Sequence, residues 1–295
     1  MTTATDRRSV LSGLGALSLA GCGVSVRLDL PFDLGGLEAR NDGRLGLAAL
    51  DITTGRQIGW RADERFVYCS TFKAFLAAAT LVRIQDGQEG LDRLVPITAA
   101  DMVSHAPVTG PATGSSLSVD RLMQAIVEVS DNPAANLLLR AGGGIDAMRA
   151  FYRSLGDDST RVDRFEPEMN RLDGDKDTIQ PGRAAANLQR LFVDPASPLS
   201  AQSQDRLLGW MFSSPTGTDR IKAGVPAGWR VAHKTGTGGY GPTNDIGILY
   251  PPSGEPVIVA VYYHATGTTS AAANDAVIAE ATRLALAAFG YGAAA

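Results

Sequence analysis

The pattern of apolar and polar positions predicts β-strands near both ends of the chain. An apolar run at residues 45–52, a Thr-Thr-Gly turn and a second run at 57–61 are typical of a β-hairpin. Further strand patterns occur towards the C-terminus, at 229–236, 246–250 and 256–264. A long predicted helix at 271–289 closes the chain.

The middle of the chain has the periodicity of α-helices instead. Residues 71–85 are apolar almost all round, which indicates a helix buried on every side. Residues 119–127 place their apolar side chains on one helix face, and Ser118 is a suitable N-cap for them. Asn132-Pro133 starts another helix, which a run of glycines at 142–144 ends. Other helices are predicted at 145–154, 183–192 and 202–212.

The order of these elements predicts the fold class. Because strands occur at both ends and helices fill the middle, we expect an α/β plus all-α fold. A five-stranded antiparallel sheet from both termini would be flanked by helices and would carry an inserted helical lobe. Residues 30–62 and 213–291 would form the α/β lobe, and 63–212 the helical lobe. The latter includes a polar, aspartate-rich segment at 161–181 without a period, a length that is usually functional or disordered.

The N-terminal residues predict an export signal. A pair of arginines at 7–8 and a mildly apolar run at 10–20, too short to span a membrane, resemble a twin-arginine signal. The sequence Leu-Ala-Gly-Cys ending at Cys22 resembles a bacterial lipobox. We therefore expect a signal at 1–22 and a periplasmic or cell-envelope location, with lipid attachment through Cys22 and simple cleavage both open. The alternative is a frayed N-terminal helix of a cytoplasmic protein.

Composition excludes several classes of partner. The net charge of −4 gives no basic surface, so nucleic acid is not an expected partner. Without Cys22, Cys69 has no partner for a disulfide. The three histidines, at 105, 233 and 264, lack the spacing of a zinc site. A Gly-x-Gly-x-x-Gly match at 236–241 precedes a strand and not a helix, so we expect neither a dinucleotide cofactor nor a metal.

Lysine is scarce in this chain, which draws attention to Lys73. Only four of the 27 Lys and Arg residues are lysines. Ser70 and Lys73 are three residues apart, so on a helix their side chains share a face. A serine hydroxyl needs a base to become a nucleophile, and a buried lysine can lose its proton whereas an arginine cannot. Alone the pair is weak, because a lysine at the end of a core helix commonly serves packing.

Three further motifs complete a pattern. Ser130-Asp131-Asn132 lies between two predicted helices, and Lys234-Thr235-Gly236 ends a predicted strand. Singly they are an ordinary helix cap and an ordinary strand end. With the Ser70–Lys73 pair, in this order, they resemble the motif set of the penicilloyl-serine transferases, which include class A β-lactamases and penicillin-binding proteins. Residues 164–170, Arg-Phe-Glu-Pro-Glu-Met-Asn, resemble the Ω-loop of class A serine β-lactamases. The resemblance covers about residues 30–290.

The resemblance implies a role for each matching residue. Ser70 would attack the β-lactam carbonyl, and the backbone N–H groups of Ser70 and Thr237 would form the oxyanion hole. Either Lys73 directly or Glu166 through a water would take the serine proton, and the sequence leaves this choice open. Ser130 would pass a proton to the departing ring nitrogen.

The remaining matches imply a substrate-binding set. Asn132 would bind the substrate's side-chain amide, and Lys234 would hold Ser130 and attract the substrate carboxylate. Where the family often has an arginine near the Lys-Thr-Gly strand, this chain has Thr243 and Asn244, so we expect Arg220 to replace it. The implied set is Asn132, Asn170, Lys234, Thr235, Gly236, Thr237, Arg220 and His105. Glu166 and Asn170 would orient the deacylating water, and Asp177 is the expected ion-pair partner of Arg164.

The function implied is a class A β-lactamase, a monomer without a cofactor. It would hydrolyse penicillins and cephalosporins through an acyl-serine intermediate and confer antibiotic resistance. One alternative is a penicillin-binding D,D-peptidase or transpeptidase, which forms the same acyl-serine but lacks a group to hydrolyse it. Another is an envelope lipoprotein with a decayed site, which the intact side chains disfavour. Gly238 and Gly239 suggest an uncrowded site edge, and Thr237 adds a hydroxyl beside the carboxylate subsite. Both features favour acceptance of cephalosporins, while turnover of carbapenems is left open.

Overall fold

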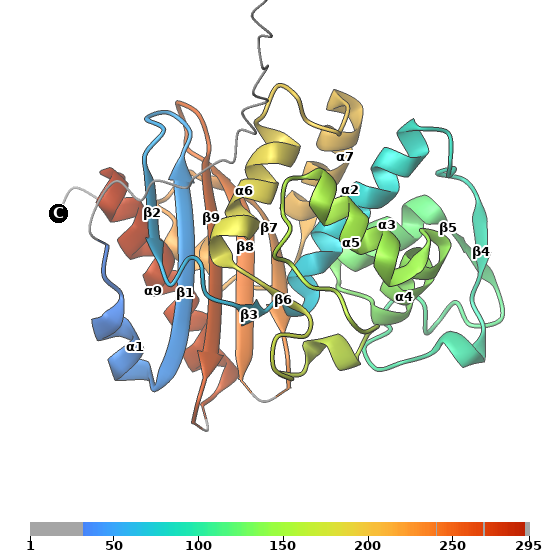
Figure 1. Ribbon diagram of the computed structural model, residues 1–295, viewed down its shortest axis with the longest axis horizontal. Helices are drawn as coiled ribbons and strands as arrows, with labels where there is room; N and C mark the ends of the chain where they lie inside the picture. The colour runs from blue at the N-terminus through green and yellow to red at the C-terminus, as the bar shows by residue number, and fades with distance from the viewer. Residues whose placement is uncertain (1–31, 240, 268, 293–295) are drawn as a thin grey trace, which may run out of the picture.

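Strands from both ends of the chain form one antiparallel sheet, as the sequence predicts. The computed structural model describes residues 32–239, 241–267 and 269–292. Across the sheet the order is β2 (Gln57–Trp60), β1 (Gly43–Asp51), β9 (Val257–Ala265), β8 (Pro242–Tyr250) and β7 (Arg230–Thr237). β1 and β9 pair along their whole length, so the first and last long strands lie side by side in the sheet (Figure 1).

Helices cover both faces of this sheet. On one face lie α1 (Gly35–Asn41), α8 (Ile221–Gly224) and the closing helix α9 (Ala271–Phe289). On the other face lies α6 (Pro181–Phe192). Leu45, Leu47 and Ala49 of β1 join the core beneath α9, whereas Ala48 and Leu50 join the core beneath α6. Because successive side chains of a strand alternate between faces, a strand covered on both sides shows a continuous apolar run.

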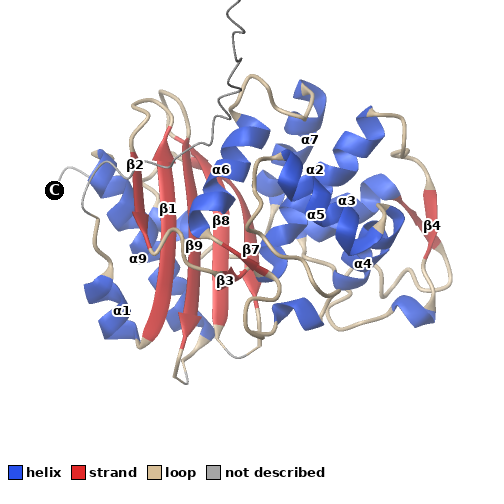
Figure 2. Ribbon diagram, viewed as in Figure 1, coloured by secondary structure: helices blue, strands red, loops and turns tan. Residues whose placement is uncertain are grey.

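The helical lobe extends beyond β7, and Figure 2 shows helices grouped at that end of the molecule. It contains α2 (Phe72–Gln85), α3 (Val119–Glu128), α4 (Asn132–Ala141), α5 (Gly144–Ser154) and α7 (Ala201–Ser213). α2 is buried over most of its length, which confirms the interpretation of its apolar pattern. Ser118 caps α3, since its side chain accepts a hydrogen bond from the backbone N–H of Arg121.

Several short elements have no counterpart in the sequence pattern. Two two-stranded ribbons pair β3 (Phe66–Val67) with β6 (Thr178–Ile179) and β4 (Leu94–Pro96) with β5 (Ser116–Ser118). Single 3₁₀ turns occur at Cys69–Thr71, Ala99–Asp101 and Glu168–Asn170. Strands of two or three residues are too short to give a period, so they are missed. The lobe boundaries at 62–63 and 212–213 stay a prediction.

β8 begins earlier than predicted. It pairs with β7 and β9 from about Pro242, whereas the apolar pattern starts only at Ile246. The reason is that Asn244 and Asp245 are buried polar residues whose side chains find partners in the fold. Buried polar groups with hydrogen-bond partners are compatible with a central strand, but they interrupt the apolar pattern.

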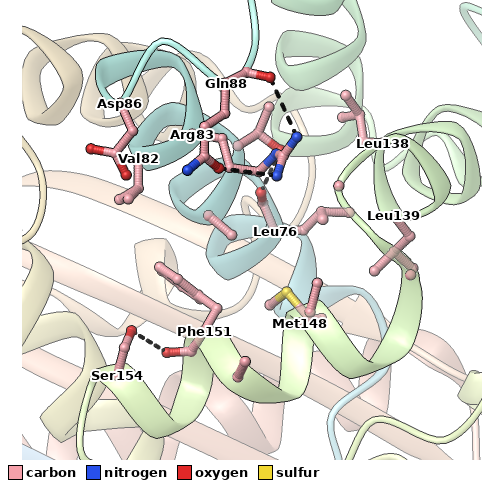
Figure 3. A pocket seen from close by; sticks show the side chains of 16 residues that line it. Leu76, Val82, Arg83, Asp86, Gln88, Leu138, Leu139, Met148, Phe151 and Ser154 are labelled. Atoms are coloured by element: carbon pink, nitrogen blue, oxygen red, sulfur yellow. Dashed lines mark hydrogen bonds between the residues drawn. The ribbon is translucent and has the colours of Figure 1, made fainter.

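An open pocket of about 300 Å³ lies on the helical lobe, between α2, α4 and α5 (Figure 3). Its lining is mostly apolar and includes Leu76, Leu139, Met148 and Phe151. None of the motif residues lines it. The site that the sequence indicates therefore lies elsewhere, at the junction of α2 and β7. Within the described part of the chain, no helix is long and apolar enough to cross a membrane.

Candidate active site

Ser70 lies in the 3₁₀ turn that leads into α2, directly against β7. A Cβ atom at Gly236 would lie 2.7 Å from the carbonyl oxygen of Tyr68 and 3.1 Å from the backbone nitrogen of Ser70. Only glycine fits at this distance, because real Cβ atoms do not approach backbone atoms so closely. Cys69 adopts a positive φ of 49° in the same turn. The close approach brings the backbone of the serine turn next to the end of β7.

Lys73 lies one helical turn after Ser70 and is completely buried. Its Nζ atom is 3.0 Å from Ser70 Oγ, 2.5 Å from Asn132 Oδ1 and 3.0 Å from Glu166 Oε1. It also donates to the carbonyl oxygen of Ser130 at 2.7 Å. Burial lowers the pKa of Lys73, while the carboxylate of Glu166 acts in the opposite direction. The amine is thus placed to exchange a proton with the serine hydroxyl.

The Ser130-Asp131-Asn132 motif lies at the start of α4. Asp131 caps this helix, since its side chain accepts a hydrogen bond from the backbone N–H of Ala134 at 2.9 Å. It also accepts hydrogen bonds from the backbone N–H of Val108 and from that of Thr109. Asn132 donates from Nδ2 to the carbonyl oxygen of Ser104, which directs its Oδ1 atom towards Lys73. Asp131 therefore holds the start of α4, with Ser130 and Asn132 on either side of it, against the segment at 108–109.

Lys234 of β7 meets the same network from the sheet side. Its Nζ atom donates to Ser130 Oγ at 3.2 Å and to the carbonyl oxygen of Thr235 at 2.9 Å. Burial, followed by the neighbouring charge of Lys73, holds the pKa of Lys234 well below its usual value. The hydroxyl of Ser130 thus lies between two amines, 3.4 Å from Lys73 Nζ and 3.2 Å from Lys234 Nζ.

Glu166 reaches the site from the long polar segment and is also buried. Asn136 of α4 holds its backbone at both ends: Oδ1 accepts the N–H of Glu166 and Nδ2 donates to its carbonyl oxygen, each at 2.9 Å. Asn170 Nδ2 donates to Glu166 Oε2. Glu166 Oε1 forms an ion pair with the Lys73 amine, whereas Asn170 Oδ1 has no hydrogen-bond partner among the described residues. A buried acceptor without a donor, next to a carboxylate, is a setting that a water molecule fits.

The segment that carries Glu166 is closed by the expected ion pair. Arg164 Nε lies 2.5 Å from Asp177 Oδ2, which confirms the prediction. The other oxygen of Asp177 accepts the backbone N–H groups of Asp163 and Arg164 and the hydroxyl of Tyr68. Asp177 is completely buried, so these four contacts join the two ends of the loop to each other and to the residues before Ser70.

Arg220 lies beside the end of β7. The sequence predicts that it replaces the arginine that the family often has near this strand. Its guanidinium donates to the carbonyl oxygens of Gly236 and Asn244 and to the hydroxyl of Thr237, at 2.8 to 3.1 Å. Asp275 of α9 accepts from its Nε atom at 2.7 Å. These contacts hold the guanidinium at the end of β7, beside Thr237.

The structure brings most of the predicted residues into one network, and His105 lies at its margin. Its side chain is exposed, and Nε2 lies 2.9 Å from the carbonyl oxygen of Val129. Its own carbonyl oxygen accepts the backbone N–H of Asn132. Sequence reasoning missed Asn136 and Asp275, because a lone asparagine and a lone aspartate on helices carry no local signal.

Gly238 does not leave an open edge, contrary to the expectation. A Cβ atom there would lie 2.4 Å from the carbonyl oxygen of Asn170 and 3.1 Å from Cys69 Sγ, whereas nothing lies within 4 Å at Gly239. The end of β7 therefore packs closely against the loop of Glu166. Cys69 is completely buried in this contact, and burial raises the pKa of its thiol well above the usual value.

No group of three or more His, Cys, Asp or Glu side chains among the described residues could hold a metal ion. The charged groups of the site instead pair with one another and with neighbouring amides. Ser70, Lys73, Ser130 and Glu166 form a continuous chain of contacts. Such a chain can activate a hydroxyl and then a water, which are the two steps of acyl transfer to solvent.

The chain is similar to known proteins along most of its length. The model of the β-lactamase enzyme family matches residues 33–289. The β-lactamase FAR-1 of Nocardia farcinica is 40% identical over 252 residues, which are 84% of this chain and 79% of that protein. The carbapenem-hydrolyzing β-lactamase KPC of Klebsiella oxytoca is 39% identical over 286 residues, 95% and 96% of the two chains. The structure of an ancestral class A β-lactamase is 48% identical with a TM-score of 0.83, covering 87% of this chain and 98% of that one.

Proposed function

The chain belongs to the β-lactamase enzyme family, and from this premise we propose that it is a class A serine β-lactamase. It hydrolyses the β-lactam amide bond of penicillins and cephalosporins and so confers antibiotic resistance. The observation that carries this proposal is the position of Glu166. Its carboxylate is 3.0 Å from the Lys73 amine, which is itself 3.0 Å from the Ser70 hydroxyl, a span that one water molecule can bridge.

The first half of the reaction forms an acyl-serine. Ser70 Oγ attacks the carbonyl carbon while its proton leaves towards Lys73, or through a water towards Glu166; both acceptors lie along the same chain of contacts. The backbone N–H groups of Ser70 and Thr237 would stabilise the negative charge on the carbonyl oxygen, and one such donor is typically worth about 10²–10³ in rate. Ser130, between the two amines, relays a proton to the leaving ring nitrogen.

The second half releases the acyl group to water. Glu166 takes a proton from a water that Asn170 helps to orient, and the resulting hydroxide attacks the ester carbonyl. A penicillin-binding D,D-peptidase lacks a carboxylate at this position, so its acyl-enzyme persists. The buried carboxylate, braced by Asn136, favours hydrolysis over that alternative.

The substrate carboxylate binds where two cations converge. Lys234 is buried at the end of the site, and Arg220 lies beside Thr237 with Asp275 behind it. The hydroxyls of Thr235 and Thr237 lie on the same strand. A carboxylate between an ammonium and a guanidinium gains charge-assisted hydrogen bonds, which are about twice as strong as neutral ones.

A hydrolysis assay tests the proposal. The protein without residues 1–22 should turn over nitrocefin and benzylpenicillin many times per active site, and Ser70→Ala should abolish turnover. A single stoichiometric burst followed by a stable penicilloyl adduct on Ser70 would instead identify a penicillin-binding peptidase.

We also propose export to the periplasm or cell envelope and a monomeric state. Support for export comes from the paired arginines at 7–8 and the apolar run at 10–20, which lie outside the described residues. Mass spectrometry of the mature protein from cells distinguishes the two fates of Cys22: a lipid-modified N-terminal cysteine, or an unmodified N-terminus after cleavage. Retention of residues 1–22 in cytoplasmic protein would refute export, and light scattering measures the oligomeric state.

A further inference from the structure

A short stretch of chain at 214–217, which we call the 214–217 segment, follows α7 and lies beside the site. α7 ends at Ser213, and Ser214 leaves the helical conformation with a ψ of 121°. The next residue is Pro215, and the residue before a proline is disfavoured in a helix. α7 itself packs against both α3 and β7. The 214–217 segment therefore starts where the helical lobe meets the sheet.

Ser214 attaches this segment to the helical lobe. Its hydroxyl donates to the carbonyl oxygen of Glu128 at 3.2 Å. Glu128 is the last residue of α3, and carbonyl groups at a helix C-terminus have no partner within the helix. Lys222 Nζ donates to the carbonyl oxygen of Ser214 at 2.8 Å and fixes the segment from the other side. Because Glu128 lies two residues before Ser130, the attachment is close to the proposed proton relay.

The same segment holds the side chain of Thr235 on β7. Thr216 Oγ1 lies 2.9 Å from Thr235 Oγ1. Gly217 has a positive φ of 64°, and a Cβ atom there would lie 2.4 Å from Thr235 Cγ2. A side chain at Gly217 would thus displace the methyl group of Thr235. Because the segment lies against both branches of a β-branched side chain, it selects one rotamer of Thr235.

Thr235 lies beside the arginine of the proposed carboxylate site. Thr235 and Thr237 are two residues apart on a strand, so their side chains point to the same face of β7. Arg220 donates to Thr237 Oγ1 at 2.8 Å from this face. Lys234 points to the opposite face, but β7 is the edge strand of the sheet. An anion at this edge is therefore within reach of side chains from both faces.

Three hydroxyls form a row that ends at Thr235. Ser214 Oγ lies 2.9 Å from Thr216 Oγ1, which lies 2.9 Å from Thr235 Oγ1. Each hydroxyl has one proton and also accepts, so both contacts can run in either direction.

An anion beside Thr235 selects one of these directions. Thr216 then donates to Thr235, and the Thr235 proton is free to donate to the anion. The Ser214 proton turns to Thr216 and away from Glu128, whose contact is the longest of the row. Hydroxyl groups aligned in one direction strengthen each other's hydrogen bonds.

We propose that Thr216 is a positioning residue that holds the Thr235 hydroxyl for the substrate carboxylate. Thr216 acts only through Thr235: it fixes the position of the hydroxyl oxygen and supplies the donor that frees the Thr235 proton. The inference rests on the proposed function, because that function places the ring carboxylate of a β-lactam at the end of β7.

The test begins with Thr216→Val, which replaces the hydroxyl by a methyl group and keeps the shape of the side chain. KM for benzylpenicillin should rise about three- to tenfold, the effect expected for the loss of one hydrogen bond. kcat should change by less than about twofold, because the carboxylate is bound in the ground state and the transition state alike. Thr216→Ser keeps the hydroxyl and should restore KM. If Thr216→Val does not fold, Thr216→Ala gives the same comparison.

A double-mutant cycle tests whether Thr216 acts through Thr235. Thr235→Val alone should raise KM at least as much as Thr216→Val does. Adding Thr216→Val to Thr235→Val should then change KM by less than about twofold, because the hydroxyl that Thr216 positions is already absent. The methyl ester of benzylpenicillin, which lacks the anion, should show the same KM with the wild type and with Thr216→Val.

Thr282→Val is the matched control for the loss of a threonine hydroxyl. Thr282 is completely buried on α9, and its hydroxyl donates to the carbonyl oxygen of Ile278 at 2.8 Å. This variant should leave KM for benzylpenicillin unchanged, whatever its effect on the melting temperature.

An unchanged KM for benzylpenicillin in Thr216→Val would overturn the proposal. A lower KM would also overturn it, because Thr216 would then withhold the Thr235 proton from the anion. Equal effects of Thr216→Val with and without the Thr235 hydroxyl, or an equal effect on the methyl ester, would show that Thr216 does not act through Thr235.

Failure of the proposed function gives a different result. A wild-type protein that forms the acyl-serine without turnover would refute hydrolysis. The same variants are then compared by their second-order rates of acylation, measured by mass spectrometry. These rates decide the role of Thr216 separately, so the two failures are distinguishable.

Discussion

Replacing Asn136 by alanine removes both hydrogen bonds that hold the backbone of Glu166. The loss leaves a buried N–H and a buried carbonyl oxygen without a partner. Each unsatisfied group costs about 1–3 kcal/mol. The free energy of unfolding should therefore fall by about 2–6 kcal/mol, a large fraction of the roughly 5–15 kcal/mol typical of a folded protein. Urea unfolding followed by circular dichroism measures this loss.

The same substitution should slow release of the acyl group more than its formation. The two hydrogen bonds between Asn136 and the Glu166 backbone, which we call the Asn136 clamp, and the contact with Asn170 hold the Glu166 carboxylate near the site. A displacement of about 1 Å can cost about 10²-fold in rate. Stopped-flow measurements with nitrocefin should show a burst of about one product per enzyme and then a slow steady state. Mass spectrometry should find the adduct on Ser70.

Asn187→Ala is the matched control. Asn187 is a buried asparagine on α6 whose Nδ2 donates to Asp157 at 2.8 Å, away from the network around Ser70. It should destabilise the protein without a burst. If Asn136→Ala loses stability but deacylates at the wild-type rate, the clamp is only structural and the reasoning about Glu166 fails.

Three other substitutions give separate tests. Glu166→Ala should slow deacylation by about 10²–10⁴-fold, so that mass spectrometry detects a persistent adduct on Ser70, and normal clearance would remove Glu166 from its role. Arg220→Ala should lower kcat/KM for benzylpenicillin by about tenfold or more through loss of a charge-assisted hydrogen bond, and an unchanged value would mean that another cation binds the carboxylate. Glu166→Gln removes the charge that raises the pKa of Lys73, so this pKa should fall further, and an unmoved lysine signal in ¹³C NMR would contradict the coupling.

Local patterns in the sequence predict much of the fold. Each of these elements depends on residues that are close in the sequence: the helix that carries Lys73, the N-cap at Ser118 and the hairpin of β1 and β2. The register of Ser70 and Lys73 on one helix face follows from their spacing. The Arg164–Asp177 pair was expected from the family resemblance and is present.

Other features depend on contacts between distant segments. The early start of β8 is invisible to periodicity, because Asn244 finds its hydrogen-bond partners at Val67 and Tyr68. Gly238 is confined by the carbonyl oxygen of Asn170, which no local pattern could reveal. The expectation of an open edge there was wrong for this reason.

The sequence by itself therefore determined the long helices and strands, the fold class and the set of candidate reacting side chains, since these follow from short-range spacing and from the motif resemblance. Only the tertiary structure decided which residues support that set. Asn136 holds Glu166 and Asp275 holds Arg220, each from another element. Burial and charge act through space, so their partners are fixed when the sheet and the helical lobe pack together.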